Sequence, residues 1–318
     1  MKQLMLGNKA VARGLYEAGC AVVSSYPGTP STEVTEEAAK YDEMYCEWAP
    51  NEKVAMEVAF GACLAGKRSF CGMKHVGLNV AADPLFTVSY TGVNAGMVIV
   101  VADDAGMHSS QNEQDSRHHA IASKIPMLEP SDSAEARAFT MRAFELSEQF
   151  DTPVIIKMCT RVAHSQSIVE PGERVEPPVK PYEKNIGKYV MMPGNAKKRH
   201  PIVEQRTRDL IAFAENCEFN RIEWGDTSIG IIASSTCYQY AKEVFGEKAS
   251  ILKLGMINPL PEKLILDFAA KVDKLVVIEE LDPIIENHCK QLGLTVTGKD
   301  VLPIEDEFSQ NLIAEKLG

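Results

Sequence analysis

An uninterrupted apolar stretch at residues 97–102, MVIVVA, most limits the folds open to this chain. A run without polar alternation is typical of a strand buried on both faces of a parallel sheet. Apolar stretches at 21–26, 69–74 and 153–158 also have strand character, and segments with helical patterning lie between them. Strands that alternate with helices form βαβ units, so the sequence predicts an α/β fold with ligands at the carboxyl ends of parallel strands.

The pattern changes in the middle of the chain. Three prolines fall within 177–181, and hydrophobic periodicity fades apart from a helix expected at 202–215. Apolar strands and amphipathic helices then resume. We therefore expect a first domain at 1–165, a connecting region at 166–225 and a second, smaller parallel-sheet α/β domain at 226–318.

Length, charge and cysteine content limit the classes of partner and the cellular compartment that this chain fits. With 318 residues the chain is long enough for about two domains. Its net charge of −11 argues against nucleic acid or an anionic membrane surface as a partner. No apolar run approaches the ~20 residues that span a bilayer, and the N-terminus lacks the apolar core of a signal peptide. The eight cysteines include no C-x-x-C pair, which argues against a zinc ribbon or a ferredoxin-type cluster here. Scattered thiols fit a reducing compartment, so we expect a cytoplasmic protein.

Residues 51–79 combine the features expected of a site. Asn51 and Glu52 suit the start of a helix, with an acid in its first turn. Four small residues then leave one face of the helix nearly free of side chains, which allows a neighbour to approach closely. They are Ala55, Ala59, Ala62 and Gly66. A strand at 69–74 and a polar loop at 74–79 follow. The helix dipole alone also favours an acid at this position, by about 0.3–1 kcal/mol, which is the structural alternative for Glu52.

Two further polar segments are expected at the same edge of the sheet as the loop at 74–79. The turn at 26–30, YPGTP, follows a strand, and in it Thr29 suits a helix N-cap and Pro30 the first helical position. The polar loop at 103–119 follows the most apolar strand. Because the carboxyl ends of parallel strands lie at one edge of a sheet, the three segments should meet there.

These motifs resemble those of a known enzyme family. Glu52, followed by Ala at plus three and Gly at plus nine, resembles the cofactor-activating helix of thiamine diphosphate enzymes. With YPGTP at 26–30, MKHVGLN at 73–79 and GMINPLPEK at 255–263, the chain resembles the alpha subunit of indolepyruvate ferredoxin oxidoreductase, in the 2-oxoacid:ferredoxin oxidoreductase family, over nearly its whole length. The resemblance implies a pyrimidine-binding thiamine diphosphate domain, followed by a smaller domain like the C-terminal domain of transketolase.

The resemblance also implies roles for particular residues. Glu52 is implied to be catalytic, because a carboxyl group hydrogen-bonded to the aminopyrimidine ring helps to activate the cofactor. The residues implied to contact the cofactor besides Glu52 are Pro27, Gly28, Lys74, Val76, Gly77 and Asn79. Those implied to face the substrate are Thr29, His75, His108, Ser109, Gln111 and Arg117. Thr29 equally fits a plain helix cap, His75 a loop histidine with an internal partner, and the loop at 103–119 an ordinary solvated surface.

Parts of the family pattern are absent from these residues. The alpha subunit normally continues into a diphosphate-binding domain with a Gly-Asp-Gly motif and a magnesium-binding Asn-rich turn, and Gly225-Asp226-Thr227 does not match that motif. The cysteine-rich ferredoxin module has no counterpart either. We therefore expect thiamine diphosphate to be shared with a partner module that carries Mg²⁺ and the iron–sulfur clusters, with no metal on this chain, in a dimer or hetero-oligomer.

The resemblance implies a component of an enzyme that oxidatively decarboxylates a small 2-oxo acid, such as indolepyruvate or another arylpyruvate. The acyl group passes to coenzyme A and the electrons to ferredoxin, with a gamma- or beta-type oxidoreductase subunit as a further partner. Two alternatives stay open. They are a component of a non-oxidative thiamine-dependent 2-oxoacid decarboxylase, and a non-catalytic scaffold subunit of the same fold.

Overall fold

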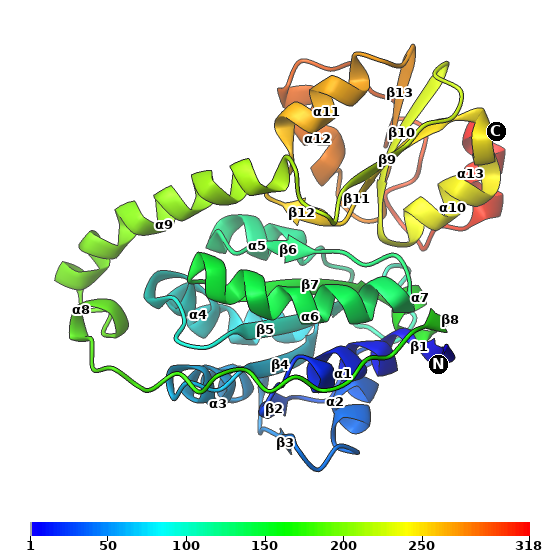
Figure 1. Ribbon diagram of the computed structural model, residues 1–318. Coiled ribbons are helices and arrows are strands. Elements are labelled where there is room, and N and C mark those ends of the chain that lie inside the picture. Colours follow the sequence, from blue (N-terminus) through cyan, green and yellow to red (C-terminus); the bar gives the residue numbers. More distant parts are fainter. Residues whose placement is uncertain (1) are drawn as a thin grey trace.

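The computed structural model describes residues 2–318, which form two α/β domains, each built on its own largely parallel sheet (Figure 1). The predicted fold class is confirmed. None of the helices in this range combines the length and the apolar composition that crossing a bilayer requires.

The larger sheet has seven strands, six of which run parallel. From one edge to the other they are β12 (Met256–Asn258), β6 (Met127–Leu128), β7 (Val154–Cys159), β5 (Met97–Asp103), β4 (Ser69–Lys74), β2 (Val22–Ser25) and β3 (Tyr45–Trp48). The antiparallel member, β12, comes from the C-terminal part of the chain and pairs Met256 with Leu128 of β6.

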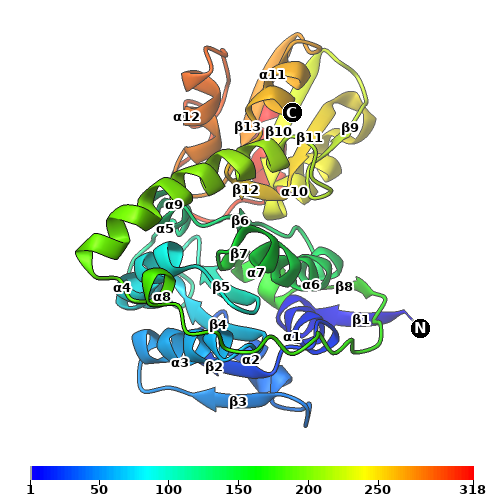
Figure 2. The same ribbon diagram turned by 60° about the vertical axis from the view of Figure 1, so that its left-hand side comes forward.

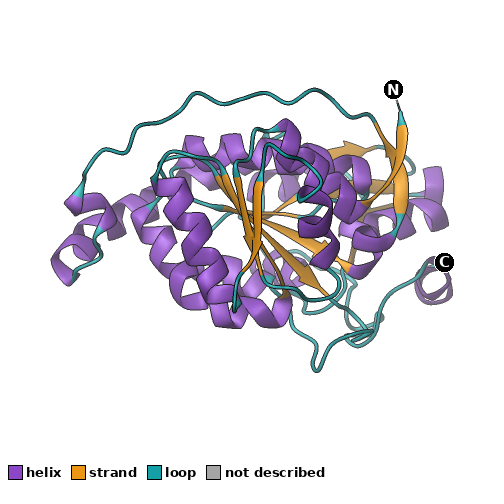
Figure 3. Cartoon of the chain, turned by 90° about the horizontal axis from the view of Figure 1, so that it is seen from below, coloured by secondary structure: helices purple, strands orange, loops and turns teal. Residues whose placement is uncertain are grey.

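Helices cover both faces of this sheet (Figure 3). One face carries α1 (Gly7–Glu17), α2 (Thr32–Ala38) and α6 (Ser133–Phe150), and the other carries α3 (Glu52–Leu64), α4 (His75–Thr91) and α5 (Arg117–Ser123). Along β5, Val98 and Val100 pack with the first set of helices, and Met97 and Ile99 pack with the second. All of β5 is buried, as expected of a central parallel strand.

The smaller domain has a four-stranded sheet in the order β13 (Lys274–Ile278), β10 (Ile229–Ser234), β11 (Ser250–Leu254) and β9 (Arg221–Glu223). Of these strands, β9 alone is antiparallel to its neighbour. α10 (Ser235–Phe245) and α13 (Gln310–Leu317) pack on one face, and α11 (Glu262–Ala269) and α12 (Ile284–Gln291) pack on the other. The core under α11 and α12 is continuous with that of the larger domain.

A long segment joins the two domains. It follows α7 (Thr160–His164) and the antiparallel pair of β1 (Gln3–Leu6) and β8 (Gln166–Val169). Residues 170–185, called the strap below, contain no helix or strand and cross the outside of the larger domain (Figure 3). α8 (Ile186–Tyr189) and α9 (Pro193–Ala214) follow, and α9 leads from beside α4 to the smaller domain (Figures 1 and 2).

Residues 74–79 are not the loop that the sequence suggested. β4 ends at Lys74, and α4 begins at the next residue and continues through Pro84. Lys74 is the N-cap of this helix but makes no side-chain cap hydrogen bond. The sequence therefore lacks the capping signal that would have marked this helix start.

The turn before α2 also differs from its prediction. Ser31, not Thr29, is the N-cap, and the helix begins at Thr32 rather than at Pro30. The N–H of Gly28 donates to the Thr32 hydroxyl and the N–H of Ser31 donates to the Gly28 carbonyl, both at 2.9 Å. These two bonds close a tight turn that contains Thr29 and Pro30, joined by a cis peptide bond.

Two other helices begin earlier than expected. α5 starts at Arg117, inside the segment predicted as a loop up to residue 119. α9 starts at Pro193 instead of residue 202. Proline is tolerated at the first position of a helix, as at Pro193. Pro201 lies inside α9, and because proline usually ends or begins a helix, the sequence suggested a helix start next to it.

Strands cross the expected domain limits. β9 lies in the expected connecting region but pairs with β11, and β12 lies in the expected second domain but pairs with β6. The limits at 1–165, 166–225 and 226–318 remain a prediction from the sequence.

Candidate functional site

Four segments meet at the carboxyl edge of the larger sheet. The turn at 26–30 follows β2, α3 follows β3, α4 follows β4, and the loop at 104–116 follows β5. Because these strands are parallel neighbours, their carboxyl ends lie side by side. The predicted convergence of polar segments is confirmed.

Glu52 occupies the first position of α3. Asn51 caps the helix by accepting a hydrogen bond from the N–H of Val54 at 3.0 Å. Glu52 is only 8% exposed, yet its carboxylate makes no hydrogen bond to another group within residues 2–318. Its oxygen atoms are not among the fully buried polar atoms, so although most of the side chain is covered, solvent or a ligand can reach the carboxylate. Glu57, one turn further along, is exposed.

Gly77 allows Glu52 to lie where it does. A Cβ atom at Gly77 would come within 2.4 Å of Glu52 Oε1 and 2.6 Å of its Cγ. On the sheet side lies Cys71, where burial raises the pKa of the thiol and the negative charge of Glu52 raises it further. The carboxylate therefore lies where α3, α4 and β4 meet.

The turn at 26–30 lies against the end of β4. A Cβ atom at Gly28 would be 3.0 Å from Lys74 Cδ, so the lysine side chain passes close to this glycine. Pro27 and Thr29 are exposed in the same turn. The turn thus presents two exposed residues next to the Lys74 side chain.

Three hydrogen bonds join the start of α4 to the loop at 104–116. Lys74 Nζ donates to the Ser109 carbonyl at 2.9 Å, His75 Nε2 donates to the Asn112 carbonyl at 3.1 Å, and Asn79 Nδ2 donates to Gln114 Oε1 at 2.9 Å. His75 is 1% exposed and its Nδ1 is buried without a partner. It supports the loop from beneath, whereas Val76 is half-buried and Asn79 exposed.

Two buried polar residues that sequence reasoning missed hold these segments in place. Asn8 Nδ2 donates to the Pro30 carbonyl at 2.7 Å, which fixes the turn from behind. Asp104 accepts hydrogen bonds from the Ser109 N–H at 2.8 Å, the Ser110 hydroxyl at 2.6 Å and the Thr160 hydroxyl at 2.8 Å. Burial works against ionisation of Asp104, but these hydrogen bonds lower its pKa. An acid directly after a buried strand is the sequence signal that points to Asp104.

His108 and Gln111 lie on the open side of the loop. His108 Nε2 is 3.2 Å from Glu307 Oε2, and the same carboxylate accepts a hydrogen bond from Arg161 at 2.5 Å. A cavity of about 230 Å³ adjoins them, lined by His108, Thr160, Arg161, His164 and Ser165. Gln111 is exposed.

Arg117 lies apart from these residues, in a buried ion cluster between the domains. Its guanidinium pairs with Asp115 at 2.6 Å and with Glu279 of the smaller domain at 2.5 Å. It also donates to the backbone carbonyls of Glu280 and Asp282, at 3.0 and 2.7 Å. The side chain is 2% exposed, so in this structure Arg117 ties the domains together and presents no surface to a substrate.

The carboxyl groups of this cluster differ in acidity. Burial works against ionisation of Asp115, but the charge of Arg117 lowers its pKa to about 2. Burial raises the pKa of Glu280 to about 7, although its Oε1 accepts a hydrogen bond from the Phe308 N–H at 2.8 Å. Lys157 pairs with Glu129 at 2.6 Å in the same cluster.

Within residues 2–318, no group of three or more His, Cys, Asp or Glu side chains is arranged to hold a metal ion. All eight cysteines are free thiols. The carboxyl edge of the sheet does offer the carboxyl group of Glu52, which lies against Gly77. The turn at 26–30 and the loop at 104–116 lie at the same edge. The carboxyl group can accept a hydrogen bond from a ring or amine nitrogen and exchange a proton with it.

Comparison with known proteins agrees with the expected relationship. Residues 13–214 match the family model described as "Pyruvate flavodoxin/ferredoxin oxidoreductase, thiamine diP-bdg". The indolepyruvate oxidoreductase subunit IorA of Archaeoglobus fulgidus is 41% identical over 100% of this chain and 54% of its own length. The subunit of the same name from Thermococcus kodakarensis is 42% identical over 99% of this chain and 52% of its own length. The chain thus spans about half the length of the curated relatives it matches, and the resemblance to this type of subunit is confirmed.

Two solved structures share the fold. The 2-oxoglutarate:ferredoxin oxidoreductase from Magnetococcus marinus has a TM-score of 0.82, at 19% identity, over 99% of this chain and 64% of that chain. A split-gene transketolase, described as an inactive beta4 tetramer, has a TM-score of 0.61, at 16% identity, over 98% of this chain and 94% of that chain. The family match covers more than half of the sequence and includes Glu52 and the segments around it, so the chain belongs to the pyruvate flavodoxin/ferredoxin oxidoreductase family, in its thiamine diphosphate-binding part.

Proposed function

We propose that this chain supplies the pyrimidine-side half of a thiamine diphosphate site in a 2-oxoacid:ferredoxin oxidoreductase that acts on indolepyruvate or a related arylpyruvate. The observation that carries the proposal is the carboxylate of Glu52, a residue only 8% exposed, which has no hydrogen-bond partner within residues 2–318 and lies against Gly77. The names of the relatives that are 41% and 42% identical support the substrate class. In this reaction the acyl group is transferred to coenzyme A and the electrons pass to ferredoxin.

The residues of the half-site fit the pyrimidine end of this cofactor. Glu52 offers a carboxyl oxygen to a ring nitrogen, and Gly77 has no side chain that would occupy the space beside it. Ala55 and Met56, on the next turn of α3, are fully buried, so the carboxyl group adjoins an apolar core. An apolar setting strengthens such a hydrogen bond.

When bound, thiamine diphosphate supplies the carbon nucleophile that attacks the 2-oxo group of the substrate. Glu52 binds a ring nitrogen through a carboxyl oxygen and holds or returns one proton there. The residues proposed to line the cofactor with Glu52 and Gly77 are Pro27, Gly28, Lys74, Val76 and Asn79. Thr29, His108, Ser109 and Gln111 are proposed to face the substrate, whereas His75 and Arg117 position the loop at 104–116.

A partner module completes the site in this proposal. Because the chain spans about half the length of its curated relatives, we assign the diphosphate, Mg²⁺ and the iron–sulfur clusters to a module equivalent to the other half. A gamma- or beta-type oxidoreductase subunit would complete the complex. The eight free thiols support a cytoplasmic location, where thiols stay reduced.

Replacement of Glu52 tests the proposal directly. In the assembled enzyme, Glu52→Gln should lower turnover by about 100-fold or more, the usual scale for a lost acid–base group. The free energy of unfolding should change by less than about 1 kcal/mol, because glutamine is also a good helix former. Glu57→Gln, on the exposed side of the same helix, is the matched control and should keep its turnover. Wild-type turnover in Glu52→Gln would rule the proposal out.

The isolated chain provides a second test. Calorimetry should show weak or undetectable binding of thiamine diphosphate with Mg²⁺, because only the pyrimidine end is held. Addition of the partner module should restore binding and acceptor reduction with indolepyruvate. Tight Mg²⁺-dependent binding by the isolated chain would instead reveal a diphosphate site within it, which favours the decarboxylase alternative.

A further inference from the structure

The outer side of α4 connects the half-site to a groove at the other end of the helix. Its exposed residues recur at helical spacing along one side, and they are Asn79, Val80, Asp83, Phe86 and Thr87. Asn79 lies at the half-site, where it donates to Gln114 of the loop. Phe86, two turns further along, is 40% exposed and lines the groove.

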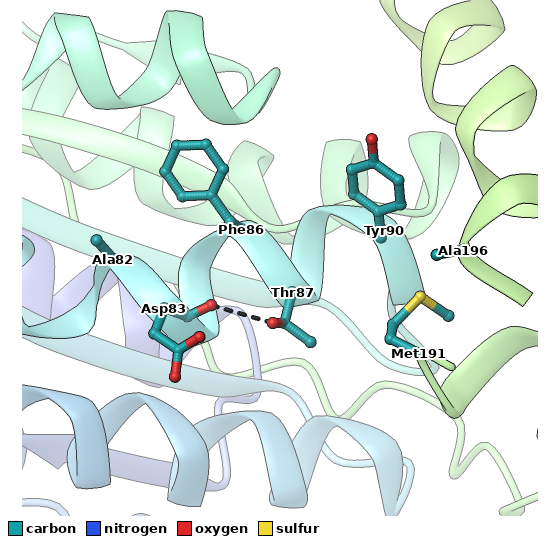
Figure 4. A pocket seen from close by; sticks show the side chains of 7 residues that line it. All are labelled: Ala82, Asp83, Phe86, Thr87, Tyr90, Met191 and Ala196. Carbon is teal, nitrogen blue, oxygen red and sulfur yellow. Dashed lines mark hydrogen bonds between the residues drawn. The ribbon is translucent and has the colours of Figure 1, made fainter. Parts of the chain in front are cut away.

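The groove lies between α4 and the corner where α8 leads into α9 (Figure 4). It has a volume of about 390 Å³ and is lined by Ala82, Asp83, Phe86, Thr87, Tyr90, Met191 and Ala196. The Thr87 hydroxyl donates to the Asp83 carbonyl of its own helix at 3.1 Å, shown as the dashed line in Figure 4. The lining is therefore mostly apolar, with Phe86 and Tyr90 on one side and Met191 on the other.

Apolar side chains remain exposed on the elements that form the groove. Besides Phe86 they are Val80 on α4 at 47%, and Ile186 at 56%, Val190 at 43%, Met192 at 63% and Ile202 at 48% on the segment that includes α8 and the first half of α9. Apolar side chains left exposed together on neighbouring elements are one sign of an interaction site. Lys197 and Lys198 are exposed on the same turn of α9 as Ala196 and form no ion pair within residues 2–318, although the chain carries a net charge of −11.

Most of the small-residue face of α3 is covered by the chain itself, and only Ala62 is half-buried. Ala55 and Ala59 are fully buried in the chain's own core. Gly66 is covered by the strap, because a Cβ atom there would lie 1.7 Å from the Lys180 carbonyl oxygen. A partner that reaches the half-site from this side of the sheet therefore meets the outer side of α4.

We propose that the partner module which completes the half-site docks along the outer side of α4 and inserts an apolar side chain into the groove. This inference rests on the proposed function, and it identifies where the partner of that site is held. The module must contact the first turn of α4, which lies at Glu52, and the exposed side of the same helix leads without interruption to Phe86. The basic rim at Lys197 and Lys198 suits a partner with carboxylates beside its apolar anchor.

Footprinting of the native enzyme tests the docking surface. The enzyme is purified from its source cells by following indolepyruvate-dependent acceptor reduction, and hydroxyl-radical labelling is compared with that of the isolated chain. Labelling of Phe86 and Met191 should fall several-fold in the enzyme. Leu266 on α11 is also 40% exposed and should label equally in both, which makes it the matched control. Equal labelling of Phe86 in both samples would overturn the inference, as would a dimer of the isolated chain that already protects the groove.

A charge placed in the groove provides the second test. Phe86→Glu should raise the Kd for the partner module at least tenfold, while turnover at saturating concentrations of that module stays near the wild-type value. Leu266→Glu should leave the Kd unchanged. The double variant K197E/K198E should bind more slowly at low salt, and its binding should depend less on salt.

The two proposals can fail independently. If Phe86→Glu binds the partner module like the wild type while Glu52→Gln loses turnover, the docking surface is wrong and the proposed function stands. If Glu52→Gln keeps its turnover, the proposed function is wrong, whatever the Kd of Phe86→Glu. Circular dichroism confirms that each variant is folded before either comparison is made.

Discussion

The backbone of Gly77 lies so close to the carboxylate of Glu52 that a Cβ atom at position 77 would come within 2.4 Å of Oε1. The acid belongs to α3 and the glycine to α4, so the position of the acid depends on how two helices pack. A methyl group at Gly77 is the smallest change that displaces the acid without removing it.

Gly77→Ala should therefore lower turnover of the assembled enzyme by about tenfold or more, because a misplaced catalytic group loses rate steeply. The unfolding free energy of the isolated chain should change by less than about 1 kcal/mol, because the atoms that must shift belong to the flexible Glu52 side chain and alanine is the better helix former in α4. Gly61→Ala is the matched control, since a Cβ atom there would meet nothing within 4 Å. It lies in α3 and should raise the unfolding free energy by up to about 1 kcal/mol. Wild-type turnover in Gly77→Ala would show that Glu52 is not held by this contact.

Removal of the Arg117 guanidinium should destabilise the whole chain. Arg117→Met leaves Asp115 and Glu279 buried without their cation, which typically costs about 3–5 kcal/mol. Arg142 pairs with Glu145 and Glu218 on the surface, so Arg142→Met should cost less than about 1 kcal/mol. Urea unfolding of both variants measures the difference, and equal losses would contradict the assignment of Arg117 to an interdomain role.

Stability should depend on pH through Glu280, because burial raises the pKa of this carboxyl group in the folded chain from its ordinary 4.5 to about 7. Between these values the folded chain holds a proton that the unfolded chain has released. The free energy of unfolding therefore falls as pH rises from about 4.5 to 7. The cost of ionising buried Glu280 is absent below this pH range and fully present above it.

Glu280→Gln removes this penalty. At pH 8 the variant should be more stable than the wild type, by an amount on the order of a few kcal/mol, and at pH 4 the two should have similar stability. Urea unfolding across this range measures the effect. Glu305→Gln, at an exposed position of the same domain, should follow the wild-type curve. A constant difference between Glu280→Gln and the wild type at all pH values would contradict the assignment.

Limited proteolysis should cut the exposed residues 182–187 sooner than the part of the strap before them. The strap is held by the Val175 N–H bonded to the Glu17 carbonyl at 2.9 Å and by Lys180 against Gly66, whereas residues 182–187 are exposed. Trypsin should therefore cut after Lys184 before it cuts after Arg174, because the Arg174 side chain donates to the Tyr16 and Cys20 carbonyls and so helps to hold the strap in place. The Lys180–Pro181 bond is not a site for trypsin. Because β12 pairs with β6, the nicked chain should elute as one particle in size-exclusion chromatography. First cuts inside 21–160 would contradict this arrangement.

The features that could be predicted from the sequence are those set by nearby residues. The buried strand at 97–102 and the Asn51 cap before Glu52 each depend on a few consecutive side chains, and both are found as expected. The start of α4 was missed because Lys74 makes no side-chain cap bond. Arg117 lies in a polar segment whose composition is typical of a loop. It is buried because it pairs with Glu279, which lies 162 positions away in the sequence, and nearby residues give no sign of this pair.

The pairing of β12 with β6 also has a consequence for how the chain is made. Leu128 of β6 is synthesised well before its partner Met256, which lies 128 residues later (256 minus 128). At about 5–20 residues per second, an interval on the order of ten seconds separates the two on the ribosome. During this time the sheet edge has no partner, and the two-residue length of β6 limits what can pair with it wrongly. The larger domain therefore cannot complete its own sheet during synthesis until much of the smaller domain has emerged.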